Sequence, residues 1–149
     1  MKTLTFKIEI HTTKEKLWEK MLDPQSFKRW TSEFAEGSYF EGSWSKGSKI
    51  RFLTPDGDGM TSMIAENRPF SYLSIKHLGF VKKGVDDMDS DAVRSWAPAY
   101  ENYILNETEG GTELRIEMDV APEFEECMSA SWPKALNKLK EICEEVESD

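Results

Sequence analysis

The feature that most constrains the fold is a change in the spacing of apolar residues directly after the first strand. Residues 3–10 alternate between apolar and polar types, which predicts a strand whose buried face carries every second residue from Leu4 to Ile10. Two helical segments follow at once. Thr12 with Glu15 forms a capping-box pattern for the first, and Asp23-Pro24 is typical of the N-cap and first position of the second. Two short helices directly after a first strand are uncommon, so they restrict the possible architectures.

From Gly37 to Pro122 the apolar spacing is again two, with turn residues between the segments. Short connections of this kind favour an antiparallel meander with one face on a core. The positions predicted to face inward are Ile50, Phe52, Met60, Ser62, Ile64, Leu73, Ile75, His77, Tyr103, Leu105, Leu114, Ile116, Met118 and Val120. The stretch from Phe80 to Pro98 interrupts the alternation with four aspartates among small residues, and we expect a mobile loop there.

The C-terminal segment returns to helical spacing from Phe124 to Val146. Pro133 interrupts it, because proline in a helix removes one backbone hydrogen bond at a cost of about 3 kcal/mol. Either Ser131 caps a new helix, or one long helix bends near Ser129. We favour a main helix over residues 131–147 with a less regular approach before it, and we expect the acidic residues 144–149 to form a solvated helix end.

Composition indicates one domain over residues 1–149, in a soluble and cytoplasmic protein. The formal net charge of −9 argues against nucleic-acid binding, and the apolar runs are too short for membrane insertion. Cys127 and Cys143 lie about 24 Å apart on a continuous helix at 1.5 Å per residue. They are too far apart for a disulfide, so we expect two reduced thiols that face the core.

A family resemblance rests on marks spread over nearly the whole chain. These marks are Leu17-Trp18, Asp23-Pro24, Phe27, Trp30, Gly42-Ser43-Trp44, Gly47, Ile50-Arg51-Phe52, Ile64-Ala65-Glu66, Pro69, Leu73-Ser74-Ile75, Leu105, residues 110–114, Trp132, Leu136, Leu139-Lys140 and Cys143-Glu144. In this order they resemble the START-like, or SRPBCC, superfamily. Within it, the chain looks like the group related to the C-terminal domain of the activator of the ninety-kilodalton heat-shock ATPase.

The resemblance implies an α+β helix-grip fold, in which a curved antiparallel sheet wraps around a long C-terminal helix and two short helices follow strand 1. It also implies a cavity between sheet and helix. The candidate ligand-binding wall residues are Trp30, Phe34, Ile50, Phe52, Ile64, Ile75, His77, Tyr103, Leu105, Met128, Trp132 and Leu136. Apolar walls with a few polar groups suit a small molecule, but bulky Trp and Phe side chains could equally fill the space themselves.

Three polar residues are candidates for chemistry at this cavity. His77 could orient a ligand or shuttle a proton, although a lone inward histidine is more often a hydrogen-bonded core residue. Tyr103 could offer its hydroxyl group to a ligand or simply pack. Glu101 shares the parity of Tyr103; if buried it must be protonated or paired, and its place near a strand start favours exposure.

Metal and cofactor sites are not indicated by the sequence. The aspartates at 87, 89 and 91 mimic the start of a calcium loop, but Ala92 and Pro98 occupy the required glycine and glutamate positions. Asp56 and Asp58 fail in the same way, so both groups are interpreted as solvated turns. Two histidines and two distant cysteines make no zinc site. We therefore expect no metal and no obligate cofactor.

Three functions remain open. The preferred one is binding of a small hydrophobic molecule, and the main alternative is interaction with a chaperone ATPase. The chaperone activators carry a separate N-terminal domain that this chain lacks, so full activator function is not expected. The least favoured is a cyclase or hydrolase using His77, Tyr103 or Glu101 as acid–base groups, because the sequence shows no pair of titratable groups at a fixed spacing; we name no catalytic residue. The sequence indicates neither the ligand nor the oligomeric state.

Overall fold

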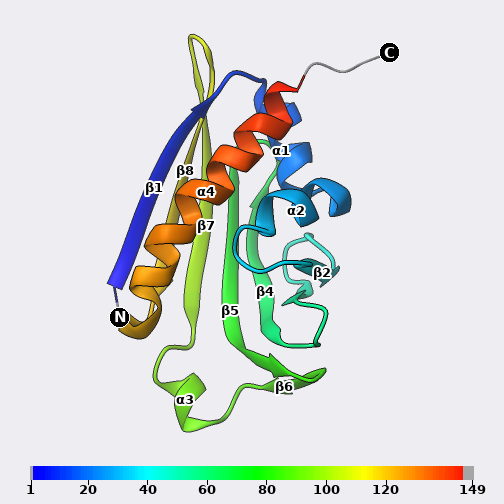
Figure 1. The fold of residues 1–149 in the computed structure, drawn as a ribbon, viewed down its shortest axis with the longest axis vertical. Coiled ribbons are helices and arrows are strands. Elements are labelled where there is room, and N and C mark those ends of the chain that lie inside the picture. Colours follow the sequence, from blue (N-terminus) through cyan, green and yellow to red (C-terminus); the bar gives the residue numbers. More distant parts are fainter. Residues whose placement is uncertain (1, 146–149) are drawn as a thin grey trace.

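A computed structural model describes residues 2–145 of the chain. Within these residues there are eight strands and four α-helices, and their order is the predicted one except for β6 and α3, which lie in the expected loop (Figure 1). The bounds are β1 (Lys2–Ile10), α1 (Lys14–Leu22), α2 (Pro24–Thr31), β2 (Tyr39–Gly42), β3 (Lys49–Leu53), β4 (Gly59–Arg68), β5 (Tyr72–Lys82), β6 (Val85–Asp87), α3 (Asp91–Arg94), β7 (Ala99–Thr108), β8 (Gly111–Val120), the 3-10 turn η1 (Pro122–Phe124) and α4 (Glu125–Glu144).

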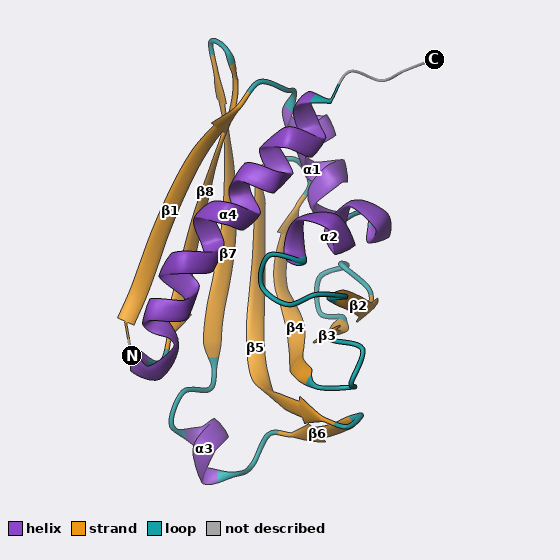
Figure 2. Ribbon diagram, viewed as in Figure 1, coloured by secondary structure: helices purple, strands orange, loops and turns teal. Residues whose placement is uncertain are grey.

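The strands form one antiparallel sheet in the order β1-β8-β7-β5-β4-β3-β2, with β6 paired to β5. Helix α4 lies across one face of this sheet, and α1 and α2 lie beside its C-terminal half (Figure 2). The inward positions predicted for β3, β4, β5, β7 and β8 are buried or half-buried. The helix-grip fold, with two short helices after the first strand, is therefore confirmed.

The two short helices begin at side-chain caps. Asp23 accepts hydrogen bonds from the backbone N–H groups of Gln25 and Ser26, both at 3.1 Å, and Pro24 takes the first helical position as predicted. The cap of α1 is Thr13, whose hydroxyl group accepts from the N–H of Lys16 at 3.1 Å. The predicted cap at Thr12 is thus wrong by one residue, because two adjacent threonines offer the same capping chemistry.

The C-terminal helix is continuous through Pro133, so the predicted start of a new helix at Ser131 is wrong. Both sides of the proline carry buried side chains, including Trp132, Ala135 and Leu136. Burying an apolar side chain of this kind contributes roughly 1.5–3 kcal/mol. Packing of this face therefore offsets the one backbone hydrogen bond that the proline removes.

The segment predicted to be a mobile loop is ordered instead. Strand β5 extends through Phe80 to Lys82, β6 pairs with it, and Ser90 caps the short helix α3 by accepting from the N–H of Val93. Val93 and Trp96 are buried, and the Trp96 ring packs on Phe80 with 5.0 Å between centroids. This second small core is the physical reason for the order, since neither residue shows a periodic pattern in the sequence.

The two cysteines have different environments, so the prediction that both thiols face the core is wrong for Cys127. That residue is exposed on α4, whereas Cys143 is buried. Burial raises the pKa of the Cys143 thiol to about 12, because the thiolate loses its hydration.

The predicted solvated acidic end lies partly outside the described residues, at 146–149. Within them, Glu144 accepts a hydrogen bond from the backbone N–H of His11 at 2.9 Å and pairs with Lys140. Glu145 pairs with Arg29 at 2.5 Å. These two acidic residues therefore connect the end of α4 to β1 and α2, and they are not merely solvated.

Candidate functional site

A cavity of about 360 Å³ lies between the N-terminal half of α4 and the end of the sheet next to α3. Strands β5 and β7, helix α2 and the segments on either side of α3 supply its walls. Of the predicted wall residues, the following line it: Trp30, Phe34, Phe52, Ile75, His77, Tyr103, Met128 and Trp132. The space is therefore not completely filled by the bulky side chains around it.

Four other predicted wall residues do not line the cavity. Ile50, Ile64, Leu105 and Leu136 are buried in the main apolar core, in contact with other core side chains. Their inward direction was predicted correctly, but direction alone does not separate a residue that faces open space from one that faces a neighbour. For these four positions, the space in front of the side chain is occupied.

Several lining residues were absent from the predicted set. Phe80 and Trp96 come from the segment expected to be a loop, Ala99 begins β7, and Phe124 comes from the turn before α4. Trp44 and Phe27 carried a signal, since both belong to the family marks. Trp96 carried none, because no local periodicity places it on a strand or helix. Its contribution depends on the second small core.

Aromatic rings form the wall beneath α4. The ring centroid of Trp132 lies 4.9 Å from that of Phe34, 6.1 Å from Tyr103 and 6.2 Å from Trp30. The Phe34 and Tyr103 rings meet Trp132 edge-to-face, the Trp30 ring is tilted to it, and all three separations are typical of aromatic contacts. The indole N–H groups of Trp44, Trp96 and Trp132 have no hydrogen-bond partner among the described residues. Buried polar groups without a partner are rare in an ordinary core, so the cavity wall differs from one in this respect.

A chain of hydrogen bonds runs from the core to the cavity. Ser62 Oγ on β4 lies 2.7 Å from His77 Nδ1 on β5, and His77 Nε2 lies 3.1 Å from Glu101 Oε1 on β7. The Tyr103 hydroxyl donates to the other carboxylate oxygen of Glu101. Ser62 is buried behind His77, whereas His77, Glu101 and Tyr103 line the cavity. Glu101 is therefore the acceptor at which the chain meets the open space.

The expectation that Glu101 is exposed is wrong. Only 15% of its side chain is accessible. The residue pairs in register with Met118 on β8, and it points to the inner face with Tyr103, two residues along β7. The sheet extends beyond this position on both sides, so proximity to the strand start does not bring the carboxylate to the surface.

Protonation in this group follows from burial and from the donors available. Desolvation, followed by the neighbouring Glu101 charge, raises the pKa of Tyr103 well above its usual value, so its phenol stays protonated and donates. Tyr103 donates to one Glu101 oxygen, and His77 Nε2 donates to the other in the tautomer that carries its proton there. The arrangement can accept a proton from a ligand, or a hydrogen bond from a ligand donor, at Glu101.

Metal binding finds no support in the described part of the chain. Among residues 2–145, no group of three or more His, Cys, Asp or Glu side chains is placed to hold an ion. Asp87 accepts hydrogen bonds from the backbone N–H groups of Asp89 and Ser90, and Asp56 does so from that of Asp58. Both aspartates therefore serve as local turn caps.

None of the helices in residues 2–145 combines the length and apolar composition that a membrane crossing requires.

Comparison with known families decides the wider relationship. The profile of the family described as "Activator of Hsp90 ATPase homolog 1-like protein" matches residues 11–144. The chain belongs to this family. No curated protein matches the sequence.

Solved structures share the fold at low sequence identity. Protein MLL2253 from Mesorhizobium loti is 17% identical with a TM-score of 0.76, and the match covers 99% of this chain and 100% of that one. The Aha1 dimer from Colwellia psychrerythraea is 19% identical with a TM-score of 0.72, covering 97% of each chain. CalU16 from Micromonospora echinospora is 17% identical with a TM-score of 0.65, covering 98% of this chain and 76% of that one. At these identities the structures establish the fold alone.

Proposed function

We propose that this family member is a cytoplasmic binding domain that holds one small, largely apolar molecule between the sheet and α4. The observation that carries the proposal is the cavity of about 360 Å³, with aromatic walls and a polar group at Glu101. Cavities that bind small molecules measure roughly 300–1,000 Å³ and combine apolar walls with a few polar groups. A cavity at the lower end of this range suits a guest of one or two fused rings.

Plugging the cavity tests this proposal. Ala99 is buried on β7 and lines the cavity, so Ala99→Leu places extra carbon atoms in the open space. We expect the variant to weaken binding of the neutral probe 2-naphthylmethanol at least about tenfold in isothermal titration calorimetry, which corresponds to 1.4 kcal/mol.

Ala130→Leu is the matched control, because Ala130 is exposed on α4 and lies outside the cavity. Equal affinity in both variants would place the probe elsewhere and refute the proposal. If Ala99→Leu alone weakens binding, native mass spectrometry of protein purified from its own host would identify the natural guest by its mass.

A second candidate function is interaction with a chaperone ATPase. Two observations favour it: the description of the matching family names activation of the Hsp90 ATPase, and a similar structure is described as Aha1. A pull-down with purified Hsp90 from the same host, followed by an ATPase assay, tests it. The Ala99→Leu variant should bind the chaperone as well as the unchanged protein, since this interaction would use the surface.

Ser62 is not placed to act as a hydrolytic nucleophile. Ser62 and His77 are adjacent, but Ser62 is 1% exposed and does not line the cavity. A nucleophile must reach the reacting atom of its substrate, and here the imidazole lies between the hydroxyl group and the open space. The hydrogen-bonded chain therefore positions Glu101 and supplies no nucleophile.

A further inference from the structure

The charges around the cavity have one sign. Among the described residues that line it, no lysine or arginine occurs, whereas two carboxylates do, Glu101 and Asp119. Asp119 is already occupied: its oxygens accept from the Thr3 hydroxyl and from the backbone N–H of Tyr100, both at 3.0 Å. It also lies between the inward residues Met118 and Val120 on β8, so its side chain points to the opposite face. Glu101 is the carboxylate that faces the guest.

Among the described residues, no lysine or arginine contacts Glu101; its partners are His77 and Tyr103. Tyr103 donates from a neutral phenol, and His77 contacts the other oxygen. A neutral imidazole satisfies both of its contacts. When the Ser62 hydroxyl donates to Nδ1, Nε2–H donates to Glu101 and every buried group has a partner. A protonated ring would instead donate to Ser62 Oγ and leave the buried Ser62 hydroxyl hydrogen without a partner among the described residues.

The surrounding rings add a second attraction for positive charge. Trp132, Phe34 and Tyr103 lie together at one wall, and Phe52 packs edge-on to His77 with 5.9 Å between ring centroids. The faces of aromatic rings attract cations, most strongly where water is excluded. A half-buried carboxylate beside several such faces is the combination that recognises an organic ammonium group.

The same arrangement opposes a guest with a carboxylate. Two like charges in a site of low dielectric repel strongly, and no cation in the cavity wall would compensate the second charge. The net charge of −9 adds a weaker long-range repulsion. Fatty acids and aromatic acids therefore fit the shape of the cavity but not its electrostatics.

We infer that Glu101 selects guests that carry a protonated amine on an apolar ring or chain, and that the cavity rejects carboxylic acids of the same shape. This inference rests on the proposed binding function. Glu101 is a specificity-determining residue in this account, held in place by His77 and Tyr103.

Three probes of nearly equal shape test the inference by calorimetry at pH 7: 2-naphthylmethylamine, 2-naphthylmethanol and 2-naphthoic acid. We expect the unchanged protein to bind the amine at least about tenfold more tightly than the alcohol, and the acid most weakly. Glu101→Gln should reduce the preference for the amine to within about twofold and should improve binding of the acid.

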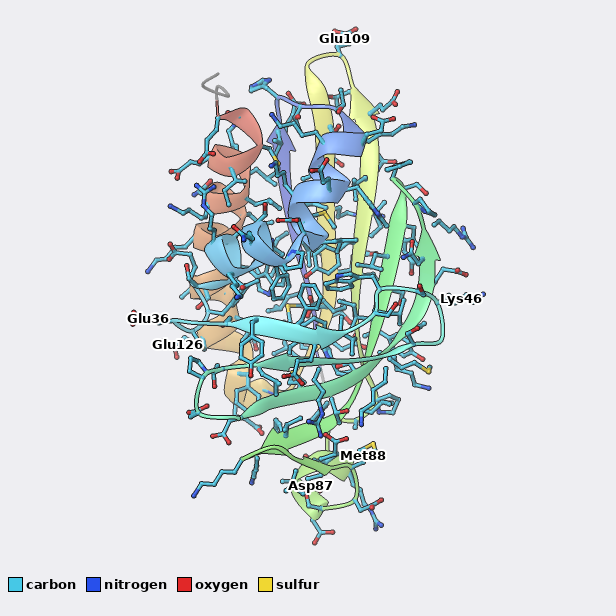
Figure 3. All side chains as sticks on the ribbon, turned by 90° about the vertical axis from the view of Figure 1, so that its right-hand side faces the viewer. Glu36, Lys46, Asp87, Met88, Glu109 and Glu126 are labelled. Atoms are coloured by element: carbon cyan, nitrogen blue, oxygen red, sulfur yellow. The ribbon has the colours of Figure 1, made fainter. Side chains whose placement is uncertain are left out.

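Glu109→Gln is the matched control, because it also removes one negative charge. Glu109 lies at the exposed tip of the β7–β8 hairpin, at the far end of the molecule from Asp87 and Met88 (Figure 3). This variant should leave all three affinities unchanged. Thermal melting shows whether Glu101→Gln is folded; if it is not, the ranking of the three probes by the unchanged protein still decides the question.

The outcomes separate this inference from the proposed function. Equal binding of amine and alcohol by the unchanged protein, or a preference for the amine that survives in Glu101→Gln, would overturn the role of Glu101 while leaving the binding function intact. Binding of none of the three probes would overturn both. Tightest binding of the acid would reverse the electrostatic argument and refute the inference.

Discussion

The two halves of α4 bury the same kind of helix face in different ways. Towards its C-terminus, Ala135, Leu139 and Ile142 are almost completely buried in a close-packed aliphatic core with Leu114. Towards its N-terminus, Trp132 and Met128 face the cavity. Aliphatic side chains interdigitate and fill the space between helix and sheet, whereas flat rigid rings brace one another and leave a gap. The difference shows that an apolar face predicts burial but does not predict filling.

The largest expected effect contrasts two truncations on α4. Leu139→Ala removes a fully buried side chain from the packed half and should lower the free energy of unfolding by about 2–5 kcal/mol. Met128→Ala acts on a half-buried residue beside existing space and should cost about 1 kcal/mol or less. Urea denaturation of both variants measures the contrast. Equal losses would show that the two halves pack alike.

Two enlargements sharpen the comparison from the opposite direction. Ala135→Leu adds carbon atoms where no space exists and should destabilise the protein by about 1–3 kcal/mol. Ala99→Leu adds the same atoms at the cavity and should leave stability within about 0.5 kcal/mol of the unchanged protein. Thermal melting of the pair provides the test. A larger loss for the Ala99 variant would mean that the cavity does not accept the added side chain.

Breaking the chain of hydrogen bonds behind the cavity should lower the free energy of unfolding by a similar or smaller amount than the enlargement at Ala135. Ser62→Ala leaves the buried Nδ1 of His77 without its partner and should cost about 1–3 kcal/mol. Ser45→Ala, at an exposed serine of the β2–β3 connection, should change stability by less than about 0.5 kcal/mol. Denaturation curves for the two variants that coincide would refute the assigned contact.

The smallest expected effect on stability comes from an ion-pair cluster between β6 and β3. Asp86 on β6 pairs with Lys49 and Arg51 on β3, each at 2.6 Å. Burial alone would raise the pKa of Asp86, but the hydrogen bonds from Lys49 and Arg51 outweigh it and lower the pKa below 3.8. A lowered pKa in the folded state stabilises the protein above the unfolded value of 3.8. This contribution is lost as the pH falls through the folded value.

Asp86→Asn should therefore lower the melting temperature at pH 7 by about 2–4 °C, as expected for a loss of about 1 kcal/mol. The difference from the unchanged protein should shrink as the pH falls below 3.8. Melting curves recorded between pH 7 and pH 3 measure this trend. A difference that stays constant across that range would assign the effect to packing and not to charge.

Much of the fold could be predicted because it depends on local signals. The alternation in residues 3–10 and the cap at Asp23 involve neighbours in sequence, and both are confirmed. The continuity of α4 through Pro133 and the order around Trp96 could not be predicted, since distant side chains stabilise them. Glu101 was correctly placed on the face of Tyr103, but its pairing with His77 depends on the register between β5 and β7.

The sequence by itself determined most of the strands and helices and which of their sides face inward, because hydrophobic period and capping act over a few residues. Only the tertiary structure decided that Ile64 and Leu136 meet neighbours while Phe34 and Trp132 border open space. It also decided that Glu101 faces that space, which no lysine or arginine lines within residues 2–145. The physical reason is that the unfilled volume of a cavity and the charge of its wall depend on side chains that are far apart in the sequence. A local sequence pattern contains information only on neighbouring residues.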